Sequence, residues 1–171
     1  MRSSLRSLAI AVGAAAVIGT AGTPAAAREE VRFTGSYPIG SIVIKNQERR
    51  LYFVAGHGRA IRYPVAVGKS GKRWVGRTYV DGKYVNPAWA PPAIVKRDIP
   101  SLPDLIPGGA PNNPMGKRAL TLAGDEYAIH GTNRPKSVGR FASYGCIRMY
   151  NSDIIDLFDR VRVGTPVIVV P

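Results

Sequence analysis

The single cysteine of this 171-residue chain, Cys146, is the first candidate for chemistry because a thiolate is a strong nucleophile. It lies in the segment FASYGCIRMYN, near the C-terminus. A thiol with the reference pKa of about 8.5 is mostly protonated at neutral pH, so it needs a base that accepts its proton. Of the two histidines, His130 ends the strand-like run YAIH, where a strand end can present an imidazole to a cleft. His57 lies in the turn-like segment AGHGR, and we expect it to be solvated and without a role.

Taken together, Cys146 and His130 predict acyl transfer through a thioester. An imidazole beside the thiol can accept its proton and leave a thiolate nucleophile. Gly145 lets the backbone turn tightly, so the N–H groups of Tyr144, Gly145 and Cys146 can hold a developing oxyanion. A helix expected shortly after Cys146 would favour the thiolate further. The residues alone leave two alternatives open: an inert or chain-linking cysteine, and a structural histidine.

The beginning of the chain is typical of an exported protein. Residues 1–27 combine a basic start, a short Ala-rich apolar run and an Ala-x-Ala end, which predicts a secretory signal peptide, with a retained anchor as the alternative. In an oxidising compartment an unpaired cysteine is unusual, which favours a reactive thiol. The net charge of +13 favours anionic partners, and for an exported chain these are cell-wall polymers or membrane surfaces rather than nucleic acid. Since no group of His, Cys and carboxylate residues has the spacing in the sequence that is typical of metal ligands, we expect no metal ion, and we expect no cofactor.

Short apolar runs separated by turn signals predict a mostly β domain over residues 40–171, preceded by a polar lead-in at 28–39. The predicted strands are a hairpin of 41–45 with 50–54, a strand at 60–67, a pair of 119–123 with 126–130, and a final strand at 166–170. One helix is predicted from Asn151, capped by Asn151 or Ser152. Residues 87–114 contain eight of the 14 prolines, so we expect neither regular helix nor central strand there. A loop of this length predicts a binding lid or cleft wall.

These blocks also carry a family resemblance. The segment YAIHGTNRPKSVGRFASYGCIRMYN resembles the signature of the L,D-transpeptidases of the YkuD type, and YPVAVGK, NPAWAPP, PGGAPNNPMGKRAL and GTPVIVV are similar to further blocks of that family. The resemblance implies a β-sandwich-like fold with one short helix following the catalytic cysteine. It also implies action on the tetrapeptide stems of peptidoglycan. There the cysteine attacks the bond between diaminopimelate and D-Ala, D-Ala leaves, and the thioester passes to an amine.

The resemblance further implies roles for individual residues. Cys146 would be the nucleophile and His130 the general base and acid, with the carbonyl of Gly131 orienting the His130 ring. The backbone amides of Tyr144, Gly145 and Cys146 would form the oxyanion hole.

Four further residues are candidates for substrate binding, each with a structural alternative. Arg148 would meet a substrate carboxylate or brace its loop, and Ser143 would contact substrate or bond locally. Trp89 would line the cleft or pack among prolines. Asn133 would reach the substrate or stabilise its own turn.

The chain departs from the family pattern at two places. Tyr144 stands where the family usually has histidine, and a phenol is a poor base near neutral pH. The backbone N–H is retained at this position, so His130 becomes the one candidate base. The segment KRWVG at 72–76 also differs from the usual Thr-Pro-Thr-Gly pattern.

Three functions are therefore weighed. The first is a periplasmic, wall-associated transpeptidase that cross-links stems or attaches a protein, and that is peripheral to the membrane at most. The second uses the same thioester for carboxypeptidase, exchange or hydrolase chemistry. The third is a wall-binding module without catalysis.

Overall fold

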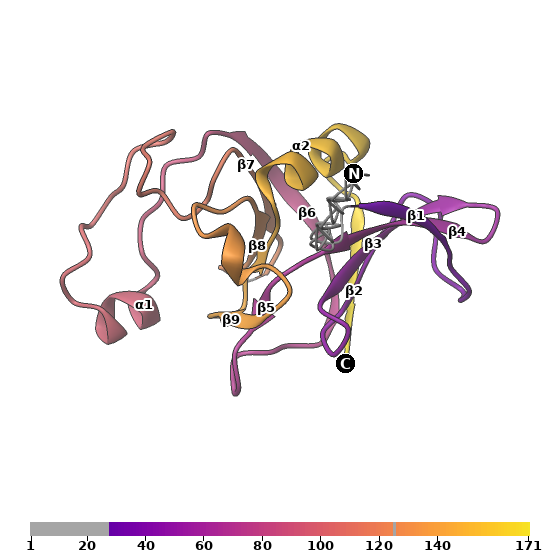
Figure 1. Cartoon of the computed structure of the whole chain (residues 1–171), viewed down its shortest axis with the longest axis horizontal. Coiled ribbons are helices and arrows are strands. Elements are labelled where there is room, and N and C mark those ends of the chain that lie inside the picture. Colours follow the sequence, from indigo (N-terminus) through magenta and orange to yellow (C-terminus); the bar gives the residue numbers. More distant parts are fainter. Residues whose placement is uncertain (1–27, 125) are drawn as a thin grey trace, which may run out of the picture.

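The computed structural model describes residues 28–124 and 126–171, so the signal peptide expected at 1–27 lies outside the described residues. The strands are β1 (Glu29–Arg32), β2 (Ile42–Lys45), β3 (Arg50–Gly56), β4 (Arg59–Pro64), β5 (Val67–Gly68), β6 (Gly76–Val85), β7 (Arg118–Leu122), β8 (Ala128–His130), β9 (Phe141–Ser143), β10 (Ile147–Arg148) and β11 (Pro166–Val170). The helices are α1 (Ala93–Asp98), α2 (Asn151–Arg160) and the 3-10 turn η1 (Pro135–Ser137). The protein is mostly β, as the sequence predicts (Figure 1).

A long strand, β6, joins two halves of one sheet. Within the described residues this sheet has nine strands in the order β1-β4-β3-β2-β11-β6-β7-β8-β10, and β5 pairs separately with β9. The first part of β6 pairs with β11 and its second part with β7, with a register shift between Val80 and Gly82. A bulge of this kind bends a strand and increases its twist. The two halves can therefore face each other as the layers of a β-sandwich-like fold.

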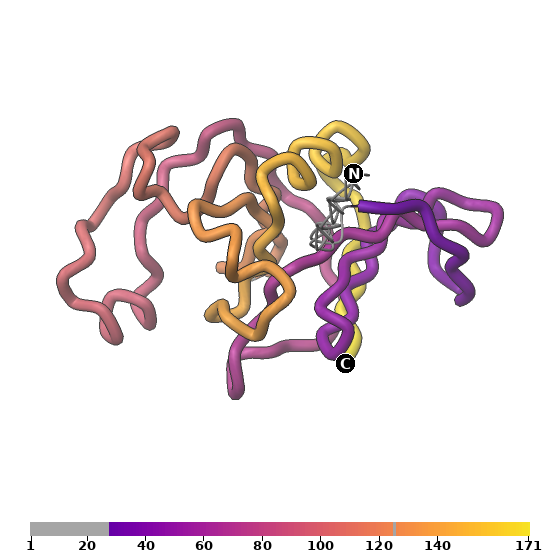
Figure 2. The backbone as a smooth tube through the Cα atoms, viewed as in Figure 1, coloured from indigo at the N-terminus to yellow at the C-terminus, as the bar shows by residue number. Residues whose placement is uncertain are grey.

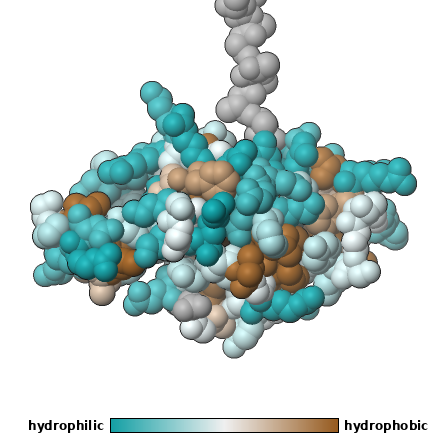
Figure 3. Space-filling model, turned by 90° about the horizontal axis from the view of Figure 1, so that it is seen from below, coloured by the Kyte–Doolittle hydropathy of each residue, from teal (hydrophilic) through white to brown (hydrophobic). Residues whose placement is uncertain are grey.

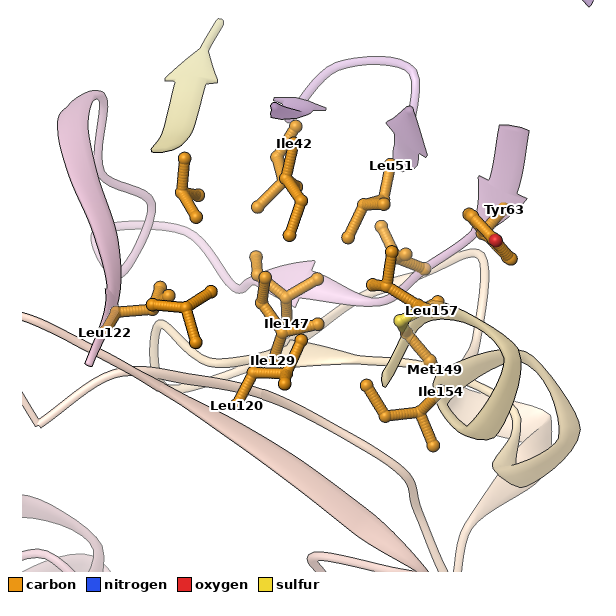
Figure 4. Close-up of a cluster of buried hydrophobic side chains, with 14 of the residues drawn as sticks. Ile42, Leu51, Tyr63, Leu120, Leu122, Ile129, Ile147, Met149, Ile154 and Leu157 are labelled. Atoms are coloured by element: carbon orange, nitrogen blue, oxygen red, sulfur yellow. The ribbon is translucent and has the colours of Figure 1, made fainter. Parts of the chain in front are cut away.

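The main core fills the space between the two halves. Figure 4 shows Ile42, Leu51 and Tyr63 pointing from one half toward Leu120, Ile129 and Ile147 of the other. The buried face of α2 closes one side of this core through Ile154 and Leu157. Because β8 and β10 are anchored here by fully buried isoleucines, the core fixes the strands that carry the candidate site.

Several predicted elements are confirmed. The hairpin of β2 and β3, the antiparallel pair of β7 and β8, the final strand β11 and the helix from Asn151 all occur where the sequence places them. Short apolar runs mark β2, β8 and β11, and the hairpin partners follow closely in the sequence.

Other expectations need correction. The lead-in at 28–39 contains β1, which pairs antiparallel with β4 and extends the sheet. The segment 87–114 contains the short helix α1, although we expected no helix in it. This helix fits because Pro92 precedes its first turn, where proline costs no hydrogen bond, and Pro100 comes after its end. The N-cap of α2 is Tyr150 and makes no side-chain capping bond, so neither Asn151 nor Ser152 caps the helix.

The segment 87–114 forms an arm that leaves the sheet after β6 and returns before β7. Figure 2 shows it as a wide excursion to one side of the molecule. Backbone hydrogen bonds in both directions between Trp89 and Ile106, of 2.9 and 2.8 Å, close its base. The face seen in Figure 3 is mainly hydrophilic and interrupted by separate apolar patches. Among the described residues no helix combines the length and the apolar character needed to cross a bilayer.

Replacing Leu157 by alanine tests how strongly α2 is bound to the core. Leu157 is fully buried, so Leu157→Ala should lower the free energy of unfolding by about 2–5 kcal/mol, measured by urea denaturation. The control Val163→Ala changes a side chain that is 57% exposed and should stay within about 0.5 kcal/mol of the unmodified chain. Equal effects of the two substitutions would contradict this assignment of the core.

Candidate active site

A cavity of about 280 Å³ lies between the arm and the strands that follow it. The arm supplies an apolar wall, and the opposite wall is polar. The cavity is lined on the polar side by His130, Asn133, Arg134, Ser143, Tyr144, Cys146 and Arg148, and on the apolar side by Trp89, Pro92, Ile94, Val95, Ile99, Leu102 and Ile106. The candidates from two separate sequence regions thus meet in one cavity.

Parallel pairing of β8 with β10 places Cys146 and His130 on the same face of the sheet, where both line the cavity. Ile147 lies opposite Ile129, and Arg148 lies opposite His130. Successive side chains of a strand point to opposite faces. Both isoleucines enter the core, so His130 and Arg148 point to the other face, and Cys146 is two positions before Arg148 on that face.

His130 is held as a buried, neutral imidazole. Its side chain is 4% exposed, and its Nδ1 lies 2.6 Å from the carbonyl oxygen of Gly131. A carbonyl only accepts hydrogen bonds, so Nδ1 carries the proton and Nε2 is left as the acceptor. Burial lowers the pKa of His130 to about 4, the positive charge of Arg148 adds to this, and nearby carbonyls oppose it.

Cys146 carries a thiol that is protonated at rest. It is unpaired and partly buried, and its Sγ lies 4.0 Å from the carbonyl oxygen of Glu126. Burial raises the pKa of this thiol above its ordinary value, against the opposing influence of the Ala128 amide and the Arg148 charge. The expected help from a helix end is missing because β10 separates Cys146 from α2, and helix-end effects fade within one turn. The resting pair is therefore a neutral thiol and a neutral imidazole.

The turn before Cys146 is held by Ser143 and depends on a glycine. Ser143 is buried, and its Oγ donates to the Cys146 carbonyl at 2.6 Å while accepting from the Gly145 N–H at 3.1 Å. Both bonds are internal, so Ser143 braces the turn rather than offering its hydroxyl to a ligand. Gly145 has a φ of 130°, and a Cβ there would lie 2.3 Å from the Tyr127 ring. The expectation of three oxyanion donors is reduced to two, since the Gly145 N–H is already used.

Asn151 fixes the loop after His130. Its Oδ1 accepts from the backbone N–H groups of Lys117 and Thr132, and its Nδ2 donates to the Thr132 carbonyl. A Cβ at Gly131 would lie 2.2 Å from this Oδ1, so glycine is required beside His130. Sequence reasoning assigned Asn151 to a helix cap and missed this role, because the partners are distant in the chain.

The side chain of Tyr144 connects the turn before Cys146 to the arm. Its hydroxyl donates to the Asp98 carboxylate at 2.9 Å, and Lys69 Nζ lies 3.8 Å from the centre of its ring. The Tyr144 side chain is therefore engaged with the arm, which leaves His130 as the candidate base in this cavity.

The remaining candidates lie along the cavity. Arg148 is half-buried, its pKa is lowered by burial, and it makes no ion pair with any described residue. Asn133 is exposed at the rim, whereas Trp89 is half-buried at the base of the arm. His57 is exposed in its turn, away from the residues that line the cavity. Residues 28–124 and 126–171 contain no group of three His, Cys, Asp or Glu side chains suited to a metal ion.

Sequence reasoning also missed Trp74 and Tyr127, whose rings stack with centroids 5.1 Å apart. The indole of Trp74 donates to the Gly145 carbonyl at 3.0 Å. The segment KRWVG had been noted only as a departure from the family pattern. The indole N–H of a packed tryptophan usually finds an acceptor, but nothing in the sequence indicates that Trp74 packs beside Gly145.

Comparisons with known proteins point to one family. The model of the YkuD family, the L,D-transpeptidase catalytic domain, matches residues 39–169. The probable L,D-transpeptidase ErfK/SrfK of Salmonella typhimurium is 42% identical over 135 residues, covering 74% of this chain and 42% of the relative. The chain thus spans less than half the length of this relative and of the probable L,D-transpeptidase YbiS of Escherichia coli, which is 41% identical.

Solved structures share the fold. The catalytic domain of the E. faecium L,D-transpeptidase acylated by ertapenem has a TM-score of 0.60 at 20% identity, covering 80% of this chain and all of that one. A Brucella melitensis protein described as a probable carnitine operon oxidoreductase has a TM-score of 0.57 at 38% identity, covering 84% and 92%. That activity is the description of the Brucella protein.

The protonation state of Cys146 can be tested by alkylation. Because burial raises the thiol pKa, the rate of iodoacetamide labelling should rise with a midpoint above about 8.5, the value of a free cysteine. Mass spectrometry across a pH series measures the rate, and Cys146→Ala provides the unlabelled control. A midpoint below neutral pH would show a resting thiolate and contradict this prediction.

The buried neutral state of His130 should make stability depend on pH. The folded-state pKa of about 4 lies below the unfolded value of about 6.5. The unfolded chain therefore binds more protons in this window, and stability, complete above pH 6.5, falls by roughly 1 kcal/mol per unit as the pH drops toward 4.

Urea denaturation at several pH values measures this slope. His130→Asn should flatten it relative to the unmodified chain, whereas His57→Asn should leave it unchanged. An identical slope in His130→Asn would show that His130 does not cause the pH dependence.

Proposed function

Since the chain belongs to the L,D-transpeptidase family, we propose that it cleaves peptidoglycan tetrapeptide stems through a thioester on Cys146 and transfers the stem to an amine. The observation that carries this proposal is that Cys146, His130 and Arg148 line one cavity, with His130 on β8, Arg148 on the adjacent parallel strand β10 and Cys146 directly before β10. A stray thiol and imidazole would not be expected to share a cleft with an unpaired cation.

In the first half of the reaction His130 acts as general base. Nε2 takes the thiol proton as Sγ attacks the carbonyl carbon of the diaminopimelate residue. A neutral thiol and a neutral imidazole suit this step, because the proton moves only when the substrate carbonyl is in place. The tetrahedral intermediate collapses when His130 returns the proton to the departing amine of D-Ala. The product is a thioester on Cys146.

In the second half an acceptor amine attacks the thioester. His130 takes a proton from this amine, and the sulfur leaves as the thiol once that proton is returned to it. The backbone N–H groups of Tyr144 and Cys146 donate to no backbone carbonyl among the described residues and would stabilise the oxyanion of both steps.

Two arginines and one carboxylate residue, Glu126, line the cavity, and this excess of positive charge supports an anionic substrate. Arg148 and Arg134 both line it, and the positive charge of Arg134 contributes to the lowered pKa of Arg148. Two cations close enough to affect each other are stabilised by a bound carboxylate. Stem peptides carry carboxylates on diaminopimelate and on D-Ala, so Arg148 is assigned to a substrate carboxylate. Asn133 and Trp89 are assigned to the walls that position the stem.

The same thioester admits a second outcome, in which water or a free D-amino acid replaces the acceptor amine. A wall-binding module without catalysis is disfavoured. Tyr144 differs from the usual histidine only in its side chain and keeps the backbone N–H, and the candidate base His130 lines the cavity. The proposal places the mature protein in the periplasm, bound to the wall by its substrate, and it includes wall-attached proteins among the acceptors.

Incubation of residues 28–171 with purified disaccharide tetrapeptides tests the function. Loss of D-Ala and formation of cross-linked dimers, followed by mass spectrometry, are expected. Cys146→Ser should abolish both, and His130→Asn should slow both by about 100-fold or more.

The product pattern separates the alternatives. Shortened stems without dimers would indicate a hydrolase in place of a transferase. Stems that remain intact would contradict catalysis by this chain. His57→Asn, which alters the exposed histidine, serves as the matched control and should retain the full rate.

A further inference from the structure

Trp74 lies outside the lining of the cavity and yet bonds to the turn that carries Cys146. It belongs to the segment between β5 and β6, and its indole N–H donates to the Gly145 carbonyl at 3.0 Å. This bond gives the buried Gly145 carbonyl a donor. It also constrains the orientation of the next residue, Cys146.

The carbonyl of Gly145 and the N–H of Cys146 belong to one peptide plane. No cis peptide bond occurs among the described residues, so in this plane the C=O and N–H bonds point in opposite directions. Fixing the carbonyl oxygen on Trp74 therefore fixes the direction of the Cys146 N–H.

The neighbouring planes are held in the same manner. The backbone N–H of Lys69 donates to the Ser143 carbonyl at 2.9 Å, which sets the direction of the Tyr144 N–H. The plane between these two is held by the Gly145 N–H on Ser143 Oγ. Lys69 and Trp74 belong to the same connecting segment, so this segment orients both N–H groups that remain without an acceptor among the described residues.

We propose that Trp74 is a positioning residue that aims the Cys146 N–H at the oxyanion formed when a carbonyl is attacked. This inference rests on the proposed function, since it requires acyl transfer at Cys146. Preorganised donors are effective because they need no reorientation during the reaction.

The surroundings of Trp74 make it a rigid support. Its carbonyl accepts from the side chain of Asn46 at 2.8 Å, and Asn46 is only 3% exposed at the end of β2. Its ring stacks on Tyr127 at an interplanar angle of 9°. Tyr127 in turn lies against Gly145, where a Cβ would come within 2.3 Å of its ring. The indole, the tyrosine and the turn therefore form one packed unit.

Two reactions of the same sulfur separate positioning from packing. Acylation by a carbapenem passes through an oxyanion, whereas alkylation by iodoacetamide displaces iodide and forms none. Trp74→Phe retains an aromatic ring on Tyr127 but removes the N–H. It should slow acylation about 10- to 100-fold, less than the 10²–10³ seen when an oxyanion donor is deleted, and leave alkylation within about twofold. With stem substrates kcat should fall while KM is unchanged.

Two further variants complete the test. Val75→Ala alters the exposed neighbour of Trp74 in the same segment and should match the unmodified chain in both reactions. If Trp74→Phe fails to fold, benzothienylalanine introduced at position 74 keeps the ring shape and replaces only the N–H by sulfur.

Equal slowing of both reactions, or no slowing of acylation, would overturn the positioning role. Failure of the proposed function would look different: the unmodified chain would be alkylated by iodoacetamide but never acylated by the carbapenem, and the inference would fall with it.

Discussion

The two-residue parallel pairing of β8 with β10 is the contact on which the candidate active site depends. It places Arg148 opposite His130, and it directs the preceding residues of the two strands, Ile147 and Ile129, into the core. A shift of one residue would turn Cys146 and Arg148 into the core and expose Ile147, at a large hydrophobic cost. The buried isoleucines thus select the register, and the register selects which side chains share the cavity. The chemistry is set by packing on the opposite face of the same strands.

Burial also determines the charges of the site. It lowers the pKa of His130 and raises that of Cys146, so both groups are neutral before a substrate binds. The positive charge of Arg148 adds to the lowering of the His130 pKa and opposes the rise of the Cys146 pKa. In the proposed mechanism the thiolate therefore forms only by proton transfer to His130, in a cavity with one apolar wall and with Arg134 and Arg148 on the opposite wall.

Local patterns in the sequence predicted much of the fold, because the hairpin of β2 and β3 and the pair of β7 and β8 join near neighbours. The pairing of β8 with β10 had no local signal, since two residues cannot show alternation. Helix α1 was missed because the prolines on both sides masked it, and β1 was missed because its partner, β4, lies beyond a turn-rich segment. Of the candidate site, Cys146, His130 and Arg148 were found from residue type and family resemblance. The bracing contacts of Trp74 and Asn151 were not found, since each joins segments that are distant in the chain.

Asn151 is the first residue of α2, and its side-chain amide also forms hydrogen bonds with backbone groups in two loops beside His130. The helix cannot separate from the sheet without releasing both loops at once. Docking of this helix and ordering of the loops beside His130 are therefore coupled. An intermediate with an intact sheet and a detached helix would lack the Asn151 bonds to both loops, so loss of α2 alone would disturb the candidate site.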